Sequence, residues 1–153
     1  MQQNNFLNNA FLHHLSIQCA DPKSLSSFYS ETLGMKSKQI HHQEKTKWLC
    51  FGNDRRIIFS PGKKKNLDFA AFSLKDENSL INLKNILTKN KVSISEYETP
   101  FFMKGSFGVK DPDNNLIIFG ISEINKGIAL SSTYSDHIYG PLQHLTFKSK
   151  DVK

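Results

Sequence analysis

Cysteine, arginine and long apolar runs are scarce in this chain. Only Cys19 and Cys50 are present among 153 residues, without the CxxC spacing of zinc or redox sites, so we expect two reduced thiols in the interior of a cytoplasmic protein. Apolar runs such as 116–119 are far shorter than the roughly 20 residues of a membrane-spanning helix. The polar first residues do not resemble a secretion signal. These absences predict a soluble domain with no membrane partner.

The positive charge of the chain comes almost entirely from lysine. The formal net charge is +6, and Arg55 and Arg56 are the only arginines among 20 basic residues. Bidentate recognition of guanine and phosphate favours arginine. The lysines are scattered apart from 63–65, and no helix-turn-helix, zinc-finger or RNP pattern occurs. We therefore expect a solvated lysine-rich surface and no nucleic-acid partner.

A short pattern recurs near both ends of the chain. Residues 14–21 read HLSIQCAD and residues 144–151 read HLTFKSKD, while a weaker copy, FAAFSLKD, occupies 69–76. In each copy an alternating strand-like run leads to an aspartate, a residue that favours helix N-caps. Such self-similarity indicates that one strand-then-helix unit is used twice and that a third use begins near residue 142.

The two complete units share one predicted order of elements, βαβββ. Asp21-Pro22 predicts the start of the first helix and Gly34 its end, and Asp76 predicts the cap of the second. The expected strands, in chain order, are 12–19, 35–41, 46–52, 55–60, 67–74, 92–98, 102–110 and 115–121.

Four segments are expected along the chain. They are a polar arm over 1–10, the paired βαβββ modules over 11–121, a linker without clear periodicity over 122–141, and the first strand of a truncated following module over 142–153. An unpaired strand has backbone groups and an apolar face to satisfy. We expect the strand near 142–149 to pair with a sheet edge or a partner chain, or to be mobile.

Three motifs lie in order along residues 11–121. They are HLSI at 14–17 before Asp21-Pro22, FYSETLG at 28–34, and DPDNNLII at 111–118. Their order and spacing resemble the vicinal oxygen chelate superfamily, which includes glyoxalase I, bleomycin- and fosfomycin-resistance proteins and extradiol ring-cleaving dioxygenases; the third is similar to the family's DPDGN-x-IE. The resemblance implies an α+β fold in which two βαβββ modules form a curved mixed sheet. Helices cover its convex face, and its concave cup holds a divalent metal in catalytic members.

The resemblance also implies metal ligands on the first and last strand of each module. His14 lies at the first-strand position of module one and Phe69 at the matching position of module two. The last-strand positions fall at Ile118 and at Ile58 or its neighbours. Because three of these four positions are apolar, we expect no metal, no other cofactor and no catalytic residue within 11–121.

The cup is instead expected to be lined by residues that do no chemistry. Its candidate lining residues are His14, Ser16, Gln18, Phe69 and Ile118. We expect His14 to be partly exposed there. If the inward- and outward-facing positions of this strand are shifted by one residue from the predicted ones, Asp68 rather than Phe69 lies in the cup.

Two-domain extradiol dioxygenases resemble this pattern of missing ligands. In them a non-catalytic N-terminal pair of modules precedes a catalytic pair that carries the iron. His144 matches the first metal ligand of that catalytic pair, and the further ligands would lie beyond Lys153. The leading interpretation is thus a non-catalytic N-terminal domain, inactive alone. Its full-length parent would use Fe(II) or Mn(II), and would cleave catechol-type aromatic diols with Fe(II) and O2.

Two further interpretations stay open. The first is a metal-free binding protein of the bleomycin-resistance type, in which a homo-oligomer, a dimer, takes up a small aromatic molecule in the cup. It predicts saturable ligand binding. The second is a lyase or transferase of the glyoxalase type, which would require a bound metal despite Phe69 and Ile118.

Overall fold

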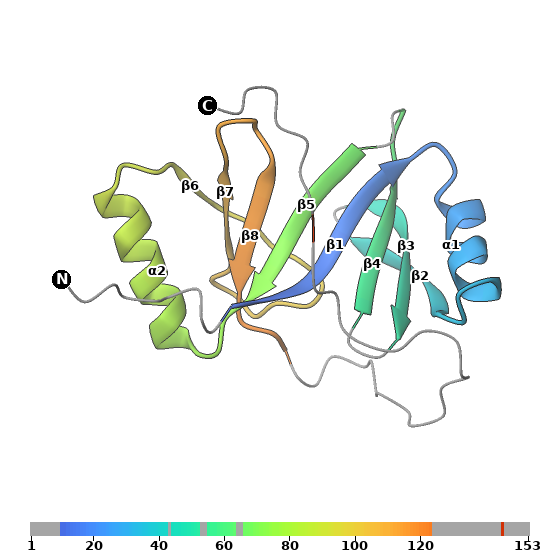
Figure 1. Cartoon of the computed structure of the whole chain (residues 1–153), viewed down its shortest axis with the longest axis horizontal. Helices are drawn as coiled ribbons and strands as arrows, with labels where there is room; N and C mark the ends of the chain where they lie inside the picture. The colour runs from blue at the N-terminus through green and yellow to red at the C-terminus, as the bar shows by residue number, and fades with distance from the viewer. Residues whose placement is uncertain (1–9, 43, 53–54, 64–65, 124–144, 146–153) are drawn as a thin grey trace.

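The computed structural model describes residues 10–42, 44–52, 55–63, 66–123 and 145. Eight strands form one mixed sheet in the order β2-β3-β4-β1-β5-β8-β7-β6, and two helices pack against it (Figure 1). The elements are β1 (Phe11–Cys19), α1 (Pro22–Glu31), β2 (Lys36–His42), β3 (Lys45–Gly52), β4 (Arg55–Pro61), β5 (Asn66–Ser73), α2 (Glu77–Lys89), β6 (Ile94–Glu96), β7 (Phe107–Lys110) and β8 (Leu116–Gly120).

Both helices begin where the sequence predicts. The Asp21 carboxylate accepts a hydrogen bond from the backbone N–H of Ser24 at 3.0 Å, and Pro22 occupies the first turn of α1. The Asp76 carboxylate accepts one from the N–H of Ser79 at 2.8 Å at the start of α2. Neither described helix has the length and apolarity to cross a bilayer.

The predicted pair of βαβββ modules is confirmed, and the two modules are related by a pseudo-twofold arrangement. β1 and β5 run antiparallel at the centre of the sheet. β4 pairs with β1 in parallel, with Ile58 opposite Ser16, and β8 pairs with β5 in parallel, with Ile118 opposite Ala71. The matching registers make Ile58 and Ile118 equivalent positions in the two modules.

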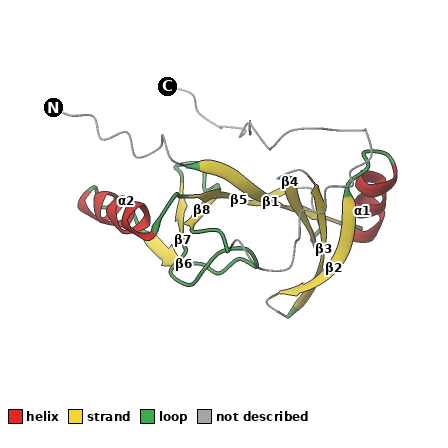
Figure 2. Ribbon diagram, turned by 90° about the horizontal axis from the view of Figure 1, so that it is seen from below, coloured by secondary structure: helices red, strands yellow, loops and turns green. Residues whose placement is uncertain are grey.

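The sheet arches, and the helices lie on its outer, convex side near the two ends (Figure 2). Buried residues under α1 include Cys50 and Phe59. Leu83 of α2 packs in one buried cluster with Phe107 and Phe119 of the sheet. Both cysteines are buried and neither forms a disulfide, in agreement with the two interior thiols predicted. Each helix therefore covers the outer face of its own module.

The middle of the convex face, between the two helices, has a small apolar cluster of its own. Leu12 and Leu15 of β1 and Ala70 of β5 are buried there. Leu145 packs against this cluster. Apart from residues 10, 122, 123 and 145, the predicted arm, linker and third-module strand lie outside the described residues.

The segment before β7 differs from the prediction. A strand was expected over 102–110, but β7 begins only at Phe107, and residues 97–106 form a loop. Backbone N–H of Tyr97 donates to the Ser106 carbonyl at 3.2 Å, and the Ser106 hydroxyl donates back to the Tyr97 carbonyl, so the ends of the loop meet. The alternating pattern fails here because Phe101 and Phe102 are both buried beneath the sheet rather than placed on opposite faces.

Candidate functional site

A β-bulge in β1 directs two successive histidines to the concave face. The register of β1 against β5 shifts by one residue between Leu12 and His14, which leaves His13 as the extra residue. Both imidazole rings then contact the Phe101 ring, with centroids 6.1 Å from His13 and 5.0 Å from His14. They contact Phe102 in the same way, at 5.3 and 5.0 Å.

β5 has the same irregularity at the equivalent position. The register shifts between Ser16 and Ile17 of β1, and Asp68 of β5 is the extra residue. The Phe69 ring meets the His14 ring edge-on with centroids 5.6 Å apart, and Asp68 accepts a hydrogen bond from Ser16 at 3.0 Å. The bulge therefore places both Asp68 and Phe69 in the concave face, where the sequence left them as alternatives.

The half of the face around His14 is closed and apolar. Phe69, Ile58 and Ile118 belong to one buried cluster, to which the loop 97–106 contributes Phe101 and Phe102. His14 is 0% exposed, so the expectation of a partly exposed residue is wrong. The physical reason is the loop 97–106, whose backbone lies inside the arch (Figure 2). The rings of Phe101 and Phe102 on this loop contact the imidazole edge-on and cover it.

Burial keeps both histidines neutral. Desolvation, reinforced by the charge of Arg56, lowers the pKa of His13 from 6.5 to about 4. Desolvation also lowers the pKa of His14 well below its ordinary value, with repulsion from His13 and Arg56 as lesser causes. The two Nδ1 atoms lie 2.9 Å apart, and His13 Nε2 lies 3.1 Å from the Ser122 hydroxyl. One Nδ1 must donate and the other accept, which requires at least one neutral ring.

The other half of the face is polar and centres on the Asp68 carboxylate. It accepts hydrogen bonds from Gln18 Nε2 at 2.6 Å, from the Ser60 hydroxyl at 2.6 Å and from the Ser16 hydroxyl at 3.0 Å. Ser16 and Ser60 are buried, so their hydroxyls depend on this carboxylate. Gln18 and Ser16, predicted to line the cup, therefore act as donors to Asp68.

A buried lysine lies within electrostatic reach of this cluster. Lys47 of β3 is 7% exposed, and burial lowers the pKa of its ammonium, while the nearby Asp68 carboxylate opposes that change. Burial followed by the Lys47 charge lowers the pKa of His42 on β2. Burial and the Asp68 charge raise the pKa of Tyr97. The polar half thus combines one carboxylate, Asp68, with one buried ammonium, Lys47.

The sequence motifs did not reveal this polar cluster. Asp68 was predicted to lie in the cup only if the alternation of its strand shifted by one residue. Lys47 and Ser60 belong to none of the sequence motifs. Ser60 lies two residues after Ile58 on β4, and that spacing alone could have placed it on the same face.

The concave face does not fit a divalent metal. Of the four positions where the resemblance implies ligands, only His14 offers a donor atom, and its Nε2 is buried without a partner among the described residues. The other three side chains, Ile58, Phe69 and Ile118, are hydrocarbon. Within the described part of the chain, no group of three or more His, Cys, Asp or Glu side chains could hold a metal ion. His144, the remaining candidate ligand, lies outside the described residues.

Solved structures with a similar fold include ring-cleaving dioxygenases. A catechol 2,3-dioxygenase superposes with a TM-score of 0.61 at 13% identity, over 72% of this chain and 38% of that one. The 2,3-dioxygenase LapB from Pseudomonas sp. KL28 gives 0.62 at 16% identity, over 72% and 40%. An extradiol ring-cleaving dioxygenase from B. fuscum gives 0.59 at 12% identity, over 72% and 32%. The chain thus matches less than half the length of each neighbour.

Sequence comparison agrees with the fold. No curated protein sequence matches the chain significantly. The model of the Glyoxalase/Bleomycin resistance protein/Dioxygenase superfamily matches residues 11–119, which include both modules. The chain therefore belongs to the glyoxalase, bleomycin resistance protein and dioxygenase superfamily.

Proposed function

We propose that residues 11–121 are the non-catalytic N-terminal domain of an extradiol-dioxygenase-like protein. Its full-length form would cleave catechol-type aromatic diols with Fe(II) and O2. One observation carries the proposal: three of the four implied ligand positions are hydrocarbon, and Phe101 and Phe102 pack against the only remaining donor, His14. A face closed in this way supports a structural role rather than chemistry.

The lengths of the structural neighbours support the same role. The chain matches 32–40% of the dioxygenase chains described above, so those proteins contain a second part for which this domain has no counterpart. In the proposed parent, that second part carries the iron, and His144 is its first ligand.

The contact of Leu145 suggests what the domain does for its parent. Leu145 immediately follows His144 and packs on the cluster of Leu12, Leu15 and Ala70 in the middle of the convex face. Burial of apolar side chains is favourable, so this contact would help to hold Leu145 against the domain. In the proposed parent, the domain would thus hold the residue that follows the proposed metal ligand.

Two measurements test this proposal. The chain of 153 residues, supplied with Fe(II), O2 and catechol, is expected to show no ring cleavage and to retain no stoichiometric iron after desalting. Sequencing the gene beyond the codon for Lys153 is expected to show a continuing frame with further His and Glu codons. Ring cleavage by the chain alone would contradict the proposal, and so would a stop codon directly after Lys153.

A metal-free binding function is the second candidate, and the polar half of the concave face favours it. A buried ammonium at Lys47 beside the Asp68 carboxylate could recognise the polar groups of a small aromatic ligand. This candidate predicts a dimer in analytical ultracentrifugation and a saturable thermal shift with aromatic acids, and it predicts that Lys47→Met abolishes that shift. A monomer without any such shift would exclude it.

A further inference from the structure

The two edges of the sheet differ in length. β6 forms one edge and has three residues, whereas β2 forms the other and has seven, of which five are exposed. β2 lies at one end of the arch, next to α1 (Figure 2). Only β3 pairs with it among the described strands, so no described strand takes up the hydrogen-bonding groups along its outer side. β2 is therefore the edge that offers most to an added strand.

The lysines of the β2–β3 hairpin all lie on the concave face. Ile40 and Phe51 pack against the concave cluster, whereas the Ser37 hydroxyl contacts Ser26 of α1 on the convex side. Successive side chains alternate between the faces, and directly paired residues share a face. By this register, the concave side chains of the hairpin include Lys36, Lys38, Lys45 and Lys47. Neither strand contains an aspartate or a glutamate, so this end of the concave face is cationic.

The fold itself does not require this charge. The matching registers, counted outward from the equivalent residues Ile58 and Ile118, relate the positions of β6 to positions of β2. Lys38 then corresponds to Ser95, so module two forms the same part of the sheet without a charge at this position. The Lys38 ammonium lies 5.7 Å from the centroid of the Phe51 ring, which holds it over the concave face. The charge is thus a property of module one rather than of the module fold.

The lysines discriminate between the strands that could pair with β2. If two copies of β2 paired in antiparallel fashion, lysines of both copies would lie on the same face, and like charges on neighbouring strands are destabilising. An extended peptide with acidic side chains at alternate positions would instead place carboxylates beside Lys36 and Lys38. The formal net charge of +6 attracts such a peptide over a longer range. Charge complementarity therefore favours an acidic partner over a second copy of this chain.

We propose that the outer edge of β2 binds an extended acidic segment of another protein, which adds a strand to the sheet and places alternate carboxylates beside Lys36 and Lys38. Main-chain hydrogen bonds to the edge supply affinity, and the alternate side chains supply specificity. An apolar side chain fits beside Ile40, which is half-buried on the same face. For antiparallel addition, the segment reads apolar-x-acidic-x-acidic. The inference does not depend on ring-cleaving activity.

Two blocked peptides test this proposal by NMR titration of the full chain at low salt. TVTETET has the proposed pattern, and TVETTET has the same composition and charge but places its glutamates on opposite faces of a strand. We expect saturable binding of TVTETET, with TVETTET bound about fivefold more weakly or worse. Hydrogen exchange should slow at alternate backbone amides of β2, because every second N–H of an edge strand points outward. Binding by charge alone would leave this exchange unchanged.

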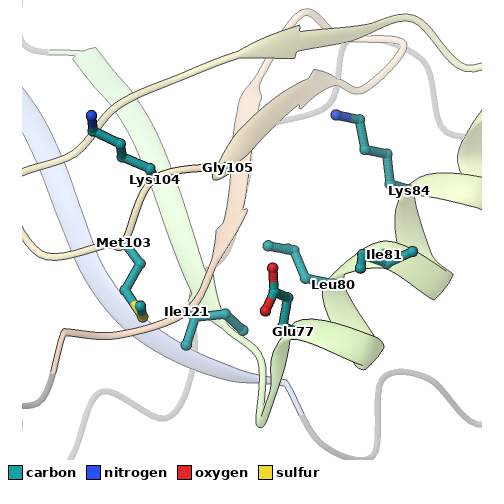
Figure 3. A pocket seen from close by; sticks show the side chains of 8 residues that line it. All are labelled: Glu77, Leu80, Ile81, Lys84, Met103, Lys104, Gly105 and Ile121. Carbon is teal, nitrogen blue, oxygen red and sulfur yellow. The ribbon is translucent and has the colours of Figure 1, made fainter.

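Charge reversal provides an independent readout. The double variant Lys36→Glu, Lys38→Glu is expected to weaken TVTETET binding at least about tenfold, and to bind TVTKTKT more tightly than the original chain does. The control Lys84→Glu, Lys104→Glu makes the same change in net charge beside a cavity of about 260 Å³ between α2 and the turn before β7 (Figure 3). This control should bind TVTETET nearly as the original chain does.

Four results would each overturn the proposal. They are equal binding of the two glutamate peptides, unchanged exchange of the β2 amides, and equal binding of TVTETET by the β2 variant and the control. The fourth is an oligothymidylate of the same charge that binds more tightly than TVTETET, because nucleic acid lacks the peptide groups that pair with a strand edge.

Discussion

Mild acid is expected to destabilise this domain through His13. The pKa of His13 falls from 6.5 in the unfolded chain to about 4 in the folded domain because the ring is buried near Arg56. Above pH 6.5 both states hold a neutral ring and the stabilisation is complete. As the pH falls from 6.5 towards 4, the unfolded chain takes up the proton first, so stability is lost over this window. Linkage gives a loss of about 2 kcal/mol at pH 5 and about 3 kcal/mol at pH 4 from this residue alone.

Urea unfolding at several pH values measures this effect, with the fluorescence of the single tryptophan, Trp48, as the probe. The variant His13→Gln cannot take up this proton. Between pH 7 and pH 5 it should therefore lose about 2 kcal/mol less unfolding free energy than the original chain. Burial, the main cause of the lowered pKa of His14, acts in both proteins. The smaller repulsion from His13 is absent from the variant, which further reduces the stability that the variant loses in acid.

His41 provides a matched control because it is an exposed histidine on β2. His41→Gln makes the same substitution at this exposed site and supplies the reference pH profile. If His13→Gln also has that profile, or if NMR titration gives His13 a pKa near 6.5, the neutral pair of buried imidazoles is not the arrangement in solution.

Three further predictions concern the packing of the concave face. Asp68→Ala leaves two buried serine hydroxyls without their acceptor, and a lower urea midpoint corresponding to about 2–4 kcal/mol is expected; an unchanged midpoint would contradict the cluster. Phe101→Ala should lower the unfolding free energy by about 3–5 kcal/mol in the same assay, against about 0.5 kcal/mol for the half-exposed Phe28→Ala, and equal losses would refute the buried position of the loop. Gly120→Ala would place a methyl group 2.3 Å from the Phe102 ring, so a lowered melting temperature and shifted aromatic NMR signals are expected, whereas a variant as stable as the original chain would show that the loop lies elsewhere.

The regular elements of this fold could be predicted because local rules and tertiary packing agree. The alternation along residues 12–19 and the Asp21-Pro22 pair predicted β1 and α1 at nearly their observed positions. The loop over 97–106 could not be predicted in the same way. Its adjacent residues Phe101 and Phe102 have high strand propensity, and only contacts with strands distant in sequence, β1 among them, bury both of them.

The candidate site was predictable to a lesser degree. The apolar half of the concave face could be inferred from Phe69 and Ile118, because these residue types are hydrocarbon in any register. The polar cluster could not be inferred from the sequence. A bulge shifts by one residue which side chains face the concave side, and it does so without changing the composition of the strand. Asp68 therefore enters the concave face together with Phe69, and no hydrophobic period signals it.

The paired bulges at His13 and Asp68 decide where the length of this gene can change. Each bulge puts two successive residues on the concave face, so deleting the codon for His13 or Asp68 would restore regular alternation and leave the other side chains on their own faces. Deleting a codon elsewhere in β1 or β5 would turn one end of that strand by half a repeat, so that residues from the concave face would exchange sides with those under the helices. Codon-level deletion scanning should therefore find the two bulges less sensitive than the rest of the central strands.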